Sequence, residues 1–262
     1  MSIDRALLGR YLRQLADLGV NEIAFDGMTA KQAVQALTSP GSAAGSARAA
    51  AVTAGSASAP PVTNTPPSTV PAASSPAADR LAALSNAAAV CTLCGLHAGR
   101  STVVFGEGSA TADVVVVGEA PGQEEDRTGR PFVGRAGKLL DLMLASAGFP
   151  RAEVYICNVL KCRPPNNRNP LPEEVSPCTT NFLHGQLEAI APRVLLAVGK
   201  FAAQALLDSQ ESIGRLRGTV HSYRGTPLVV TYHPAYLLRS PQMTRVAWQD
   251  FQLVRRVLDE QA

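Results

Sequence analysis

The 262-residue sequence lacks the features that would mark a membrane or secreted protein. It contains no run of about 18 apolar residues, which a membrane-spanning helix would need. Its first residues, Met-Ser-Ile-Asp-Arg, lack the apolar core of a secretion signal. We therefore expect a cytoplasmic protein that does not associate with membranes. In that compartment, clustered cysteines are more often metal ligands than disulfides.

A strong net charge is also missing, because the formal net charge is only +3. This total does not by itself indicate a nucleic-acid-binding protein. A protein that meets phosphates needs local positive charge, however, rather than a basic total. Two segments concentrate basic residues: Arg127, Arg130, Arg135 and Lys138 in the first, and Lys161, Arg163 and Arg168 in the second.

Residues 39–78 have one charged residue, Arg48, no aromatic residue and no Leu, Ile or Met. Such a segment cannot bury enough apolar surface to offset the entropy lost on ordering, so we predict a disordered Ala/Pro/Ser-rich linker. Before it, apolar residues at helical spacing from Ile3 to Leu18 predict an amphipathic helix in an N-terminal arm, residues 1–38. This arm either docks on the main domain or binds a partner protein. Residues 79–262 are long enough for one folded domain with its own core.

Predicted strands and helices alternate along this domain. Such alternation predicts an α/β fold with a mostly parallel sheet. Loops that leave the carboxyl ends of parallel strands form the ligand crevice, so the unusual loops of this chain should meet in one crevice. The expected strands span 113–117, 154–159, 193–198, 219–223 and 227–231, and the expected helices span 79–90, 136–147, about 173–191, a segment from 199, and about 244–259.

The segment Gly118–Gly134 is the most unusual of these loops. Its 17 residues include four glycines, two prolines, four acids and two arginines. Structureless connections of this length are uncommon in compact domains and are usually functional. Phe132, between Pro131 and Val133, argues against the alternative of a merely solvated charged loop.

Four of the five cysteines are placed as metal ligands would be. Cys91 and Cys94 form a C-x2-C pair, and Cys162 and Cys178 follow later in the chain. Cys157 lies inside an apolar strand, where we expect a small buried hydrophobic residue. Four thiolates suit either a structural Zn²⁺ or an iron–sulfur cluster. Four unligated thiols are the remaining alternative.

Taken together, the ordered motifs of this chain resemble the family 4 uracil-DNA glycosylases. The resemblance covers about residues 80–258 and includes the cysteine pattern. It implies a three-layer α/β/α glycosylase fold and a [4Fe–4S] cluster on the four cysteines. It also implies excision of uracil from single- or double-stranded DNA, leaving an abasic site. The motifs are Gly-Glu-Ala-Pro-Gly (118–122), Gly-Arg-Pro-Phe-Val-Gly (129–134), Asn-Val-Leu-Lys-Cys-Arg-Pro-Pro-Asn-Asn-Arg-Asn-Pro (158–170) and His-Pro-Ala-Tyr-Leu-Leu-Arg (233–239).

A base inside a duplex must be flipped into a pocket before an enzyme can reach it. We expect Gly118 and Ala120 to line this pocket, Phe132 to stack on uracil, and Asn158 to bind N3–H and O4. The alternatives are a phenylalanine that fills the core and an asparagine that caps a turn. Because an amide can satisfy uracil or cytosine by flipping, we expect a further hydrogen bond to fix the Asn158 amide.

Bond cleavage leaves a cationic sugar and a uracil anion with charge on O2. His233 is expected to donate a hydrogen bond to that oxygen, although a structural histidine is the alternative. The better-known uracil glycosylases carry an Asp in the equivalent first loop, whereas residues 118–122 of this chain contain only Glu119 as an acid. Glu119 and Glu125 are the candidates for orienting water and stabilising the sugar.

Leu237, Leu238 and Arg239 resemble the wedge with which this family fills the vacated base stack. The alternative for Leu237 is the start of an amphipathic helix. Two other functions stay open: a catalytically inactive nucleic-acid-binding module recruited to a polymerase or repair partner, and an electron-transfer iron–sulfur protein. The intact set of Phe132, Asn158 and His233 argues against the inactive module.

Overall fold

A computed structural model of the protein describes residues 75–261. The helix expected at 3–18 and the part of the linker before Ser75 lie outside the described residues. The first described element, α3, spans Pro76–Ala89, so it begins three residues before the expected domain boundary at residue 79. Ser75 explains this start, because its hydroxyl accepts a 3.2 Å hydrogen bond from the Ala78 N–H and caps the helix.

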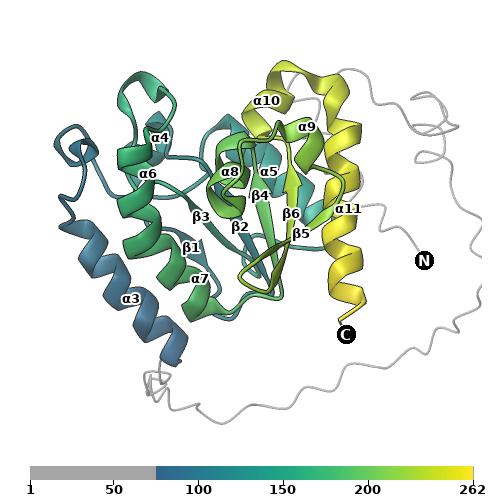
Figure 1. Cartoon of the computed structure of the whole chain (residues 1–262), viewed down its shortest axis with the longest axis horizontal. Coiled ribbons are helices and arrows are strands. Elements are labelled where there is room, and N and C mark those ends of the chain that lie inside the picture. Colours follow the sequence, from purple (N-terminus) through teal and green to yellow (C-terminus); the bar gives the residue numbers. More distant parts are fainter. Residues whose placement is uncertain (1–74, 262) are drawn as a thin grey trace, which may run out of the picture. The chain divides into compact units, whose positions relative to one another are not determined.

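The centre of the fold is a six-stranded sheet with the order β1-β3-β2-β4-β6-β5 (Figure 1). The four inner strands are parallel, and the edge strands β1 and β5 pair antiparallel to their neighbours. The prediction of a mostly parallel sheet is confirmed, whereas the short β1 was not predicted. The strands span Glu107–Gly108 (β1), Val114–Gly118 (β2), Tyr155–Asn158 (β3), Val194–Val198 (β4), Val220–Tyr223 (β5) and Thr226–Thr231 (β6).

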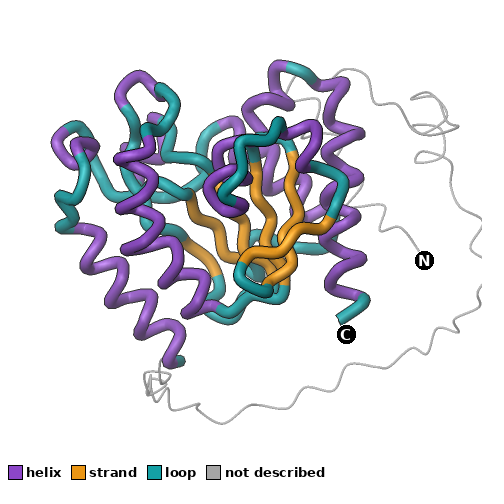
Figure 2. The backbone as a smooth tube through the Cα atoms, in the orientation of Figure 1, coloured by secondary structure: helices purple, strands orange, loops and turns teal. Residues whose placement is uncertain are grey.

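Helices separate most of the strands along the chain (Figure 2). α4 lies inside the segment 118–134, so the prediction of a structureless connection there is wrong. α6 and α7 are joined by a π-helical turn, Thr179–Leu183, and together they occupy the single helix expected at 173–191. The α-helices span Gln123–Thr128 (α4), Arg135–Ser146 (α5), Pro172–Cys178 (α6), His184–Ile190 (α7), Lys200–Leu207 (α8), Ile213–Leu216 (α9), Pro234–Arg239 (α10) and Thr244–Asp259 (α11).

Strand β2 shows how the sheet separates two hydrophobic cores. Val115 and Val117 pack with residues of α3, α7 and α8, whereas Val114 and Val116 pack with residues of α5 and α11. Successive side chains of a strand point to opposite faces, so an all-apolar strand buries both faces of the sheet. The result is the three-layer α/β/α architecture that the sequence predicts.

In the described part of the chain, no helix is both long and apolar enough to cross a membrane.

Candidate active site

Three of the predicted site residues meet where the parallel strands end. Gly118 is the last residue of β2 and pairs with Asn158, the last residue of β3. A Cβ atom on Gly118 would overlap the Asn158 Oδ1 and would lie 2.5 Å from the Phe132 Cζ. A glycine is therefore required here, because it allows the Phe132 ring and the Asn158 amide to approach the end of β2.

Phe132 has an unusual backbone conformation for an aromatic residue. Its φ is +50°, in the left-handed region that side chains with a Cβ adopt only at an energetic cost. The ring is 6% exposed, and its centroid lies 5.8 Å from that of the His233 ring. The ring also packs with the core on the α5 and α11 face, so it partly fills the core as well.

Asn158 is 1% exposed, and its Oδ1 has no hydrogen-bond partner among residues 75–261. The expected hydrogen bond that fixes this end of the amide is therefore not present, and that prediction is wrong. A buried acceptor without a partner costs free energy unless a ligand satisfies it. The backbone carbonyl of Asn158, by contrast, accepts a 2.6 Å hydrogen bond from the buried Lys161 Nζ.

His233 follows β6 and forms the N-cap of α10. Its Nδ1 accepts a 3.1 Å hydrogen bond from the Ala235 N–H. In the neutral ring the proton therefore sits on Nε2. Burial, together with the positive charge of Arg239, lowers the pKa of His233 to about 4, although the negative charge of Glu125 opposes this shift. At neutral pH the ring is consequently uncharged and carries an Nε2–H donor.

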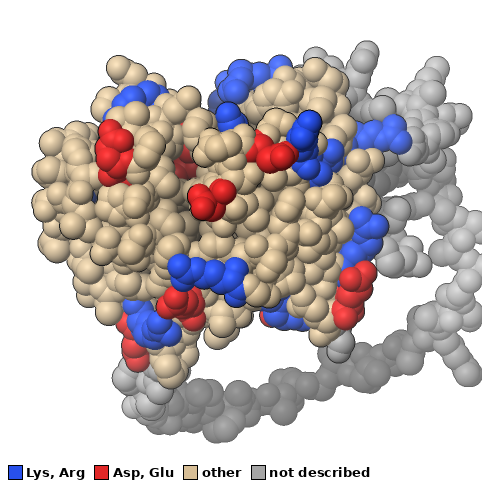
Figure 3. Space-filling model, in the orientation of Figure 1, with Lys and Arg blue, Asp and Glu red and all other residues tan. Residues whose placement is uncertain are grey.

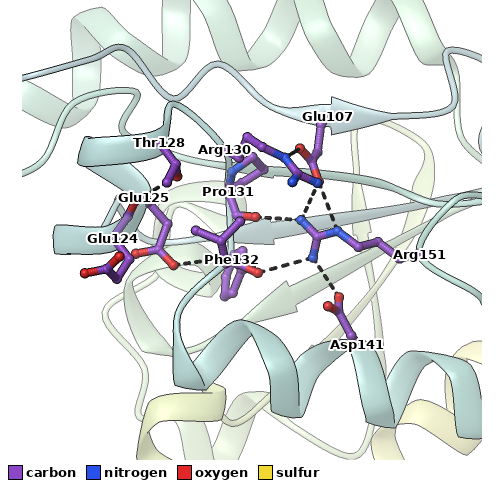
Figure 4. A network of polar contacts seen from close by, with 10 residues as sticks. Glu107, Glu124, Glu125, Thr128, Arg130, Pro131, Phe132, Asp141 and Arg151 are labelled. Carbon is purple, nitrogen blue, oxygen red and sulfur yellow. Dashed lines mark hydrogen bonds and ion pairs between the residues drawn. The ribbon is translucent and has the colours of Figure 1, made fainter.

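The two candidate acids differ in their surroundings. Glu125 lies on α4 beside the Phe132 loop (Figure 4). Its Oε1 accepts 2.9 Å hydrogen bonds from the N–H groups of both Val133 and Gly134. Glu119 directly follows β2, and burial raises its pKa to about 7. Glu119 is therefore partly protonated at neutral pH.

Residues expected to contact DNA are only partly at the surface. Leu237 is 2% exposed and belongs to the core under α10. In this structure Leu237 is a buried residue of a short helix, as in the alternative, and its expected role as an inserted wedge stays a prediction. Leu238 packs at the edge of the same core and is half-buried, and Arg239 is exposed. Tyr236 on the same helix is 36% exposed, and sequence reasoning missed it.

Much of the local positive charge that the sequence predicts is neutralised. Three of the basic residues form ion pairs with glutamates: Arg127 with Glu124, Arg130 with Glu107, and Arg168 with Glu174. A fourth, Lys161, is 2% exposed. On the face drawn in Figure 3, Lys and Arg form separate groups, with Asp and Glu among them. Arg135 and Lys138 are exposed, and within residues 75–261 neither forms an ion pair.

The four predicted ligand cysteines line a single cavity. Arg100 Nη1 donates a 3.4 Å hydrogen bond to the Cys162 Sγ, and the Lys161 backbone N–H donates a 3.3 Å hydrogen bond to the Cys178 Sγ. In residues 75–261, no three His, Cys, Asp or Glu side chains lie close enough together to hold a single metal ion. Four thiols that line one cavity are a ligand set that a Zn²⁺ ion or an iron–sulfur cluster could use.

The structure also shows the surroundings of two other residues named in the predictions, Cys157 and Ala120. Cys157 is fully buried in β3 among core residues, so its predicted role as a small hydrophobic residue is confirmed. Ala120, expected in the uracil pocket, packs against the apolar cluster of Leu96, Leu160 and Cys162. The loop 118–134 therefore connects the expected uracil pocket, at Gly118, with the cysteine region, at Ala120.

Sequence reasoning missed the roles of three charged residues that organise the site. Arg100 holds the C-x2-C segment, because it also donates to the Cys91 and Ala89 carbonyls at 2.9 and 3.0 Å. Lys161 was expected at a basic surface but is buried between the cysteine cavity and Asn158. Arg151 contacts the Phe132 loop, and no local sequence signal indicated it, since its partners lie far away along the chain.

Comparison with known proteins gives the same result as the motifs. The profile described as the Uracil DNA glycosylase superfamily matches residues 105–252. A type-4 uracil-DNA glycosylase of Thermotoga maritima is 45% identical over 182 residues, which cover 68% of this chain and 94% of the relative. A type-4 enzyme of Archaeoglobus fulgidus is 46% identical over 63% of this chain and 86% of the relative. One of Saccharolobus solfataricus is 38% identical over 69% of this chain and 87% of the relative. This chain belongs to the uracil-DNA glycosylase superfamily and, within it, to the type-4 uracil-DNA glycosylases.

Proposed function

We propose that this chain flips uracil out of DNA and hydrolyses its N-glycosidic bond, which leaves an abasic site. One observation carries the proposal: Gly118 leaves room for Phe132 and Asn158 at the end of β2, and the His233 ring lies 5.8 Å from the Phe132 ring. The names of the similar type-4 enzymes support it. We include both single- and double-stranded DNA as substrates, because the pocket binds the flipped base and does not require a paired strand.

Uracil recognition falls to Phe132 and Asn158 in this proposal. The Phe132 ring stacks on the base, an interaction worth about 1–3 kcal/mol for an aromatic side chain. The unpartnered Asn158 Oδ1 accepts the uracil N3–H, which would satisfy the buried acceptor. The amide N–H₂ then donates to O4. Cytosine offers an acceptor at N3 and a donor at N4, so it pairs only with the opposite amide orientation, and selectivity for uracil requires the orientation in which Oδ1 faces N3–H.

His233 stabilises the leaving uracil. Charge develops on the uracil O2 as the glycosidic bond breaks, and a preorganised donor at that position lowers the barrier. The neutral ring of His233 supplies the Nε2–H, because Nδ1 is occupied by the Ala235 N–H. With its pKa lowered to about 4, the ring stays neutral across the physiological pH range and donates without transferring a proton.

We assign the water-orienting and cation-stabilising carboxylate to Glu125 rather than to Glu119. Two backbone N–H groups hold one oxygen of Glu125, so its position is fixed beside the Phe132 loop. An ionised carboxylate near the electron-poor sugar acts electrostatically. Glu119, with a pKa of about 7, provides only part of a negative charge at neutral pH. Glu119 is therefore the second candidate.

The cysteine cavity is proposed to hold a [4Fe–4S] cluster on Cys91, Cys94, Cys162 and Cys178. When bound, the cluster would supply a covalent cross-link between the segment after α3 and the segment after β3, rather than chemistry on the sugar. Arg100 and the Lys161 N–H donate to two of the sulfurs, and such N–H···S bonds stabilise thiolates. The segment that carries Cys162 directly follows Asn158, the last residue of β3, so the cross-link would steady the uracil pocket.

DNA contacts are assigned to the exposed residues beside the pocket. Arg239 follows the pocket on α10, and Arg135 and Lys138 lie at the start of α5. Leu238, at the edge of the core, is more accessible than Leu237 and is therefore the first candidate for filling the vacated stack. The protein partner expected for the N-terminal arm stays a prediction, because that arm lies outside residues 75–261.

The proposal is tested with matched oligonucleotides that contain one uracil or one thymine. Purified protein should release uracil alone, and alkali should then cut the strand only at the former uracil. Binding without release would favour the inactive module. Glu125→Gln keeps an oxygen that accepts from Val133 and Gly134 but removes the charge. This variant should keep the wild-type melting temperature and lose about 10²–10⁴-fold in single-turnover rate.

Glu119→Gln is the matched comparison for Glu125→Gln. It should slow uracil release by about tenfold or less. If the wild-type rate changes between pH 6 and 8 because Glu119 titrates at about 7, that change should be absent in the variant. A larger loss in Glu119→Gln than in Glu125→Gln would reverse the assignment of the two acids.

A further inference from the structure

Arg151 uses all five of its guanidinium N–H groups, and two of them hold the loop that carries Phe132 (Figure 4). Nη2 donates to the Pro131 carbonyl at 2.6 Å, and Nη1 donates to the Phe132 carbonyl at 3.3 Å. The other three bonds reach two carboxylates. Nε and Nη2 donate to Glu107 Oε1 at 3.0 and 2.6 Å, and Nη1 donates to Asp141 Oδ1 at 2.6 Å. A guanidinium offers five donors in a fixed plane, which a lysine cannot reproduce.

The Phe132 loop is held from two sides. Arg151 binds the carbonyls of residues 131 and 132, while Glu125 binds the N–H groups of residues 133 and 134. Against the same peptide, α5 packs so closely that a Cβ atom on Gly137 would overlap the Phe132 carbonyl. A left-handed aromatic residue persists only where its surroundings fix it, and these contacts provide that restraint at φ +50°.

Arg151 is itself fixed by groups from distant parts of the chain. Glu107 lies on β1 and Asp141 on α5, whereas Arg151 lies between α5 and β3. Arg130 also binds Glu107, at 2.7 and 3.0 Å, but its side chain donates to no loop carbonyl in the described structure. The Arg151 side chain is 23% exposed, and that of Arg130 is 62% exposed. The two arginines therefore share one carboxylate but differ in contact with the loop.

We infer that Arg151 is a positioning residue for uracil recognition: it holds the carbonyls of the two peptide groups that flank Phe132 and thereby sets the ring of Phe132 over the end of β2. This inference rests on the proposed function, since it requires that Phe132 stacks on the base. Arg151 does not touch the base itself. Its contribution reaches uracil only through Phe132.

The test measures binding rather than turnover. The full-length protein is titrated with an oligonucleotide containing 2′-fluoro-2′-deoxyuridine, which resists cleavage of the glycosidic bond, and with a matched thymidine oligonucleotide. The ratio of the two affinities reports the pocket and cancels contacts to the DNA backbone. Phe132→Ala should lower this ratio about tenfold. Arg151→Lys should lower it by a similar factor, whereas the control Arg130→Lys should change it less than about twofold.

Coupling between the two residues separates positioning from a general loss of stability. In the Phe132→Ala background, Arg151→Lys should lower the ratio no further, because there is no ring left to position. If Arg151→Lys melts too low to measure, Asp141→Asn loosens the same guanidinium and should lower the ratio about threefold. An unchanged ratio in Arg151→Lys, or an additive loss in the double variant, overturns the inference. If the wild type shows no preference for the uridine analogue, or Phe132→Ala keeps it, the proposed function fails instead.

Discussion

Replacement of His233 by serine separates its two roles, as helix cap and as hydrogen-bond donor. A serine hydroxyl can still accept from the Ala235 N–H at the start of α10, so the cap survives in part. The Nε2–H donor is lost. Removal of one donor from a site where negative charge develops costs about 10²–10³-fold in rate. His233→Ser should therefore lose about that factor in single-turnover uracil release from a short oligonucleotide.

The same variant tests the charge state of His233 through stability. The pKa of His233 is lowered to about 4 in the folded protein, from an ordinary value of 6.5. Between these values the unfolded chain binds a proton that the folded chain does not, so folding stability falls as the pH drops from 6.5 towards 4. A shift of this size corresponds to about 3 kcal/mol of unfolding free energy. The contribution is fully present above pH 6.5.

Urea unfolding at pH 7 and at pH 4.5 measures this linkage. Other titrating groups act in both proteins, so the relevant quantity is the difference between wild type and His233→Ser. Wild type should lose about 2–3 kcal/mol more than the variant between the two pH values. Equal losses would show that His233 titrates normally in the folded protein. In that case the ring would be cationic in mildly acidic solution, and the claim that burial keeps His233 neutral there would be refuted.

Two remaining predictions concern the cluster and the arm. Purified protein should be brown and hold about four irons per chain. Cys178→Ser should lose this iron and melt at a lower temperature, whereas the buried control Cys157→Ser should keep the iron. Colourless protein that contains one zinc would contradict the cluster. Deletion of residues 1–74, which keeps the Ser75 cap of α3, should leave uracil release and melting temperature nearly unchanged. A truncated chain that does not fold would place the domain boundary elsewhere.

The parts of the fold that the sequence predicts depend on local pattern. Val114–Val117 has the unbroken apolar run of a strand buried on both faces, and the spacing of Leu139, Leu140, Met143 and Leu144 marks the buried side of α5. The positions of Gly118, Asn158 and His233 after strands were enough to predict their convergence, because parallel strands end at one edge of the sheet.

The parts that the sequence could not predict depend on contacts between distant residues. Arg151 lies 44 positions from Glu107, and a pattern of neighbours cannot show that pairing. Leu237 and Arg239 belong to one short helix, and only its packing on the core decides which of them is buried. The ion pairs of Arg127 and Arg130 likewise remove surface charge that a count of basic residues includes.

Base selectivity of Asn158→Asp tests the central claim of a uracil-reading pocket most directly. Single-turnover release is measured from matched oligonucleotides with one uracil or one cytosine, for wild type and for the variant. Wild type should release uracil and leave cytosine. The aspartate cannot donate to O4, so the variant should lose uracil release by about 10⁴-fold, and its preference for uracil over cytosine should narrow or invert. Wild-type rate and preference in Asn158→Asp would contradict the account, because Asn158 would then not read the base.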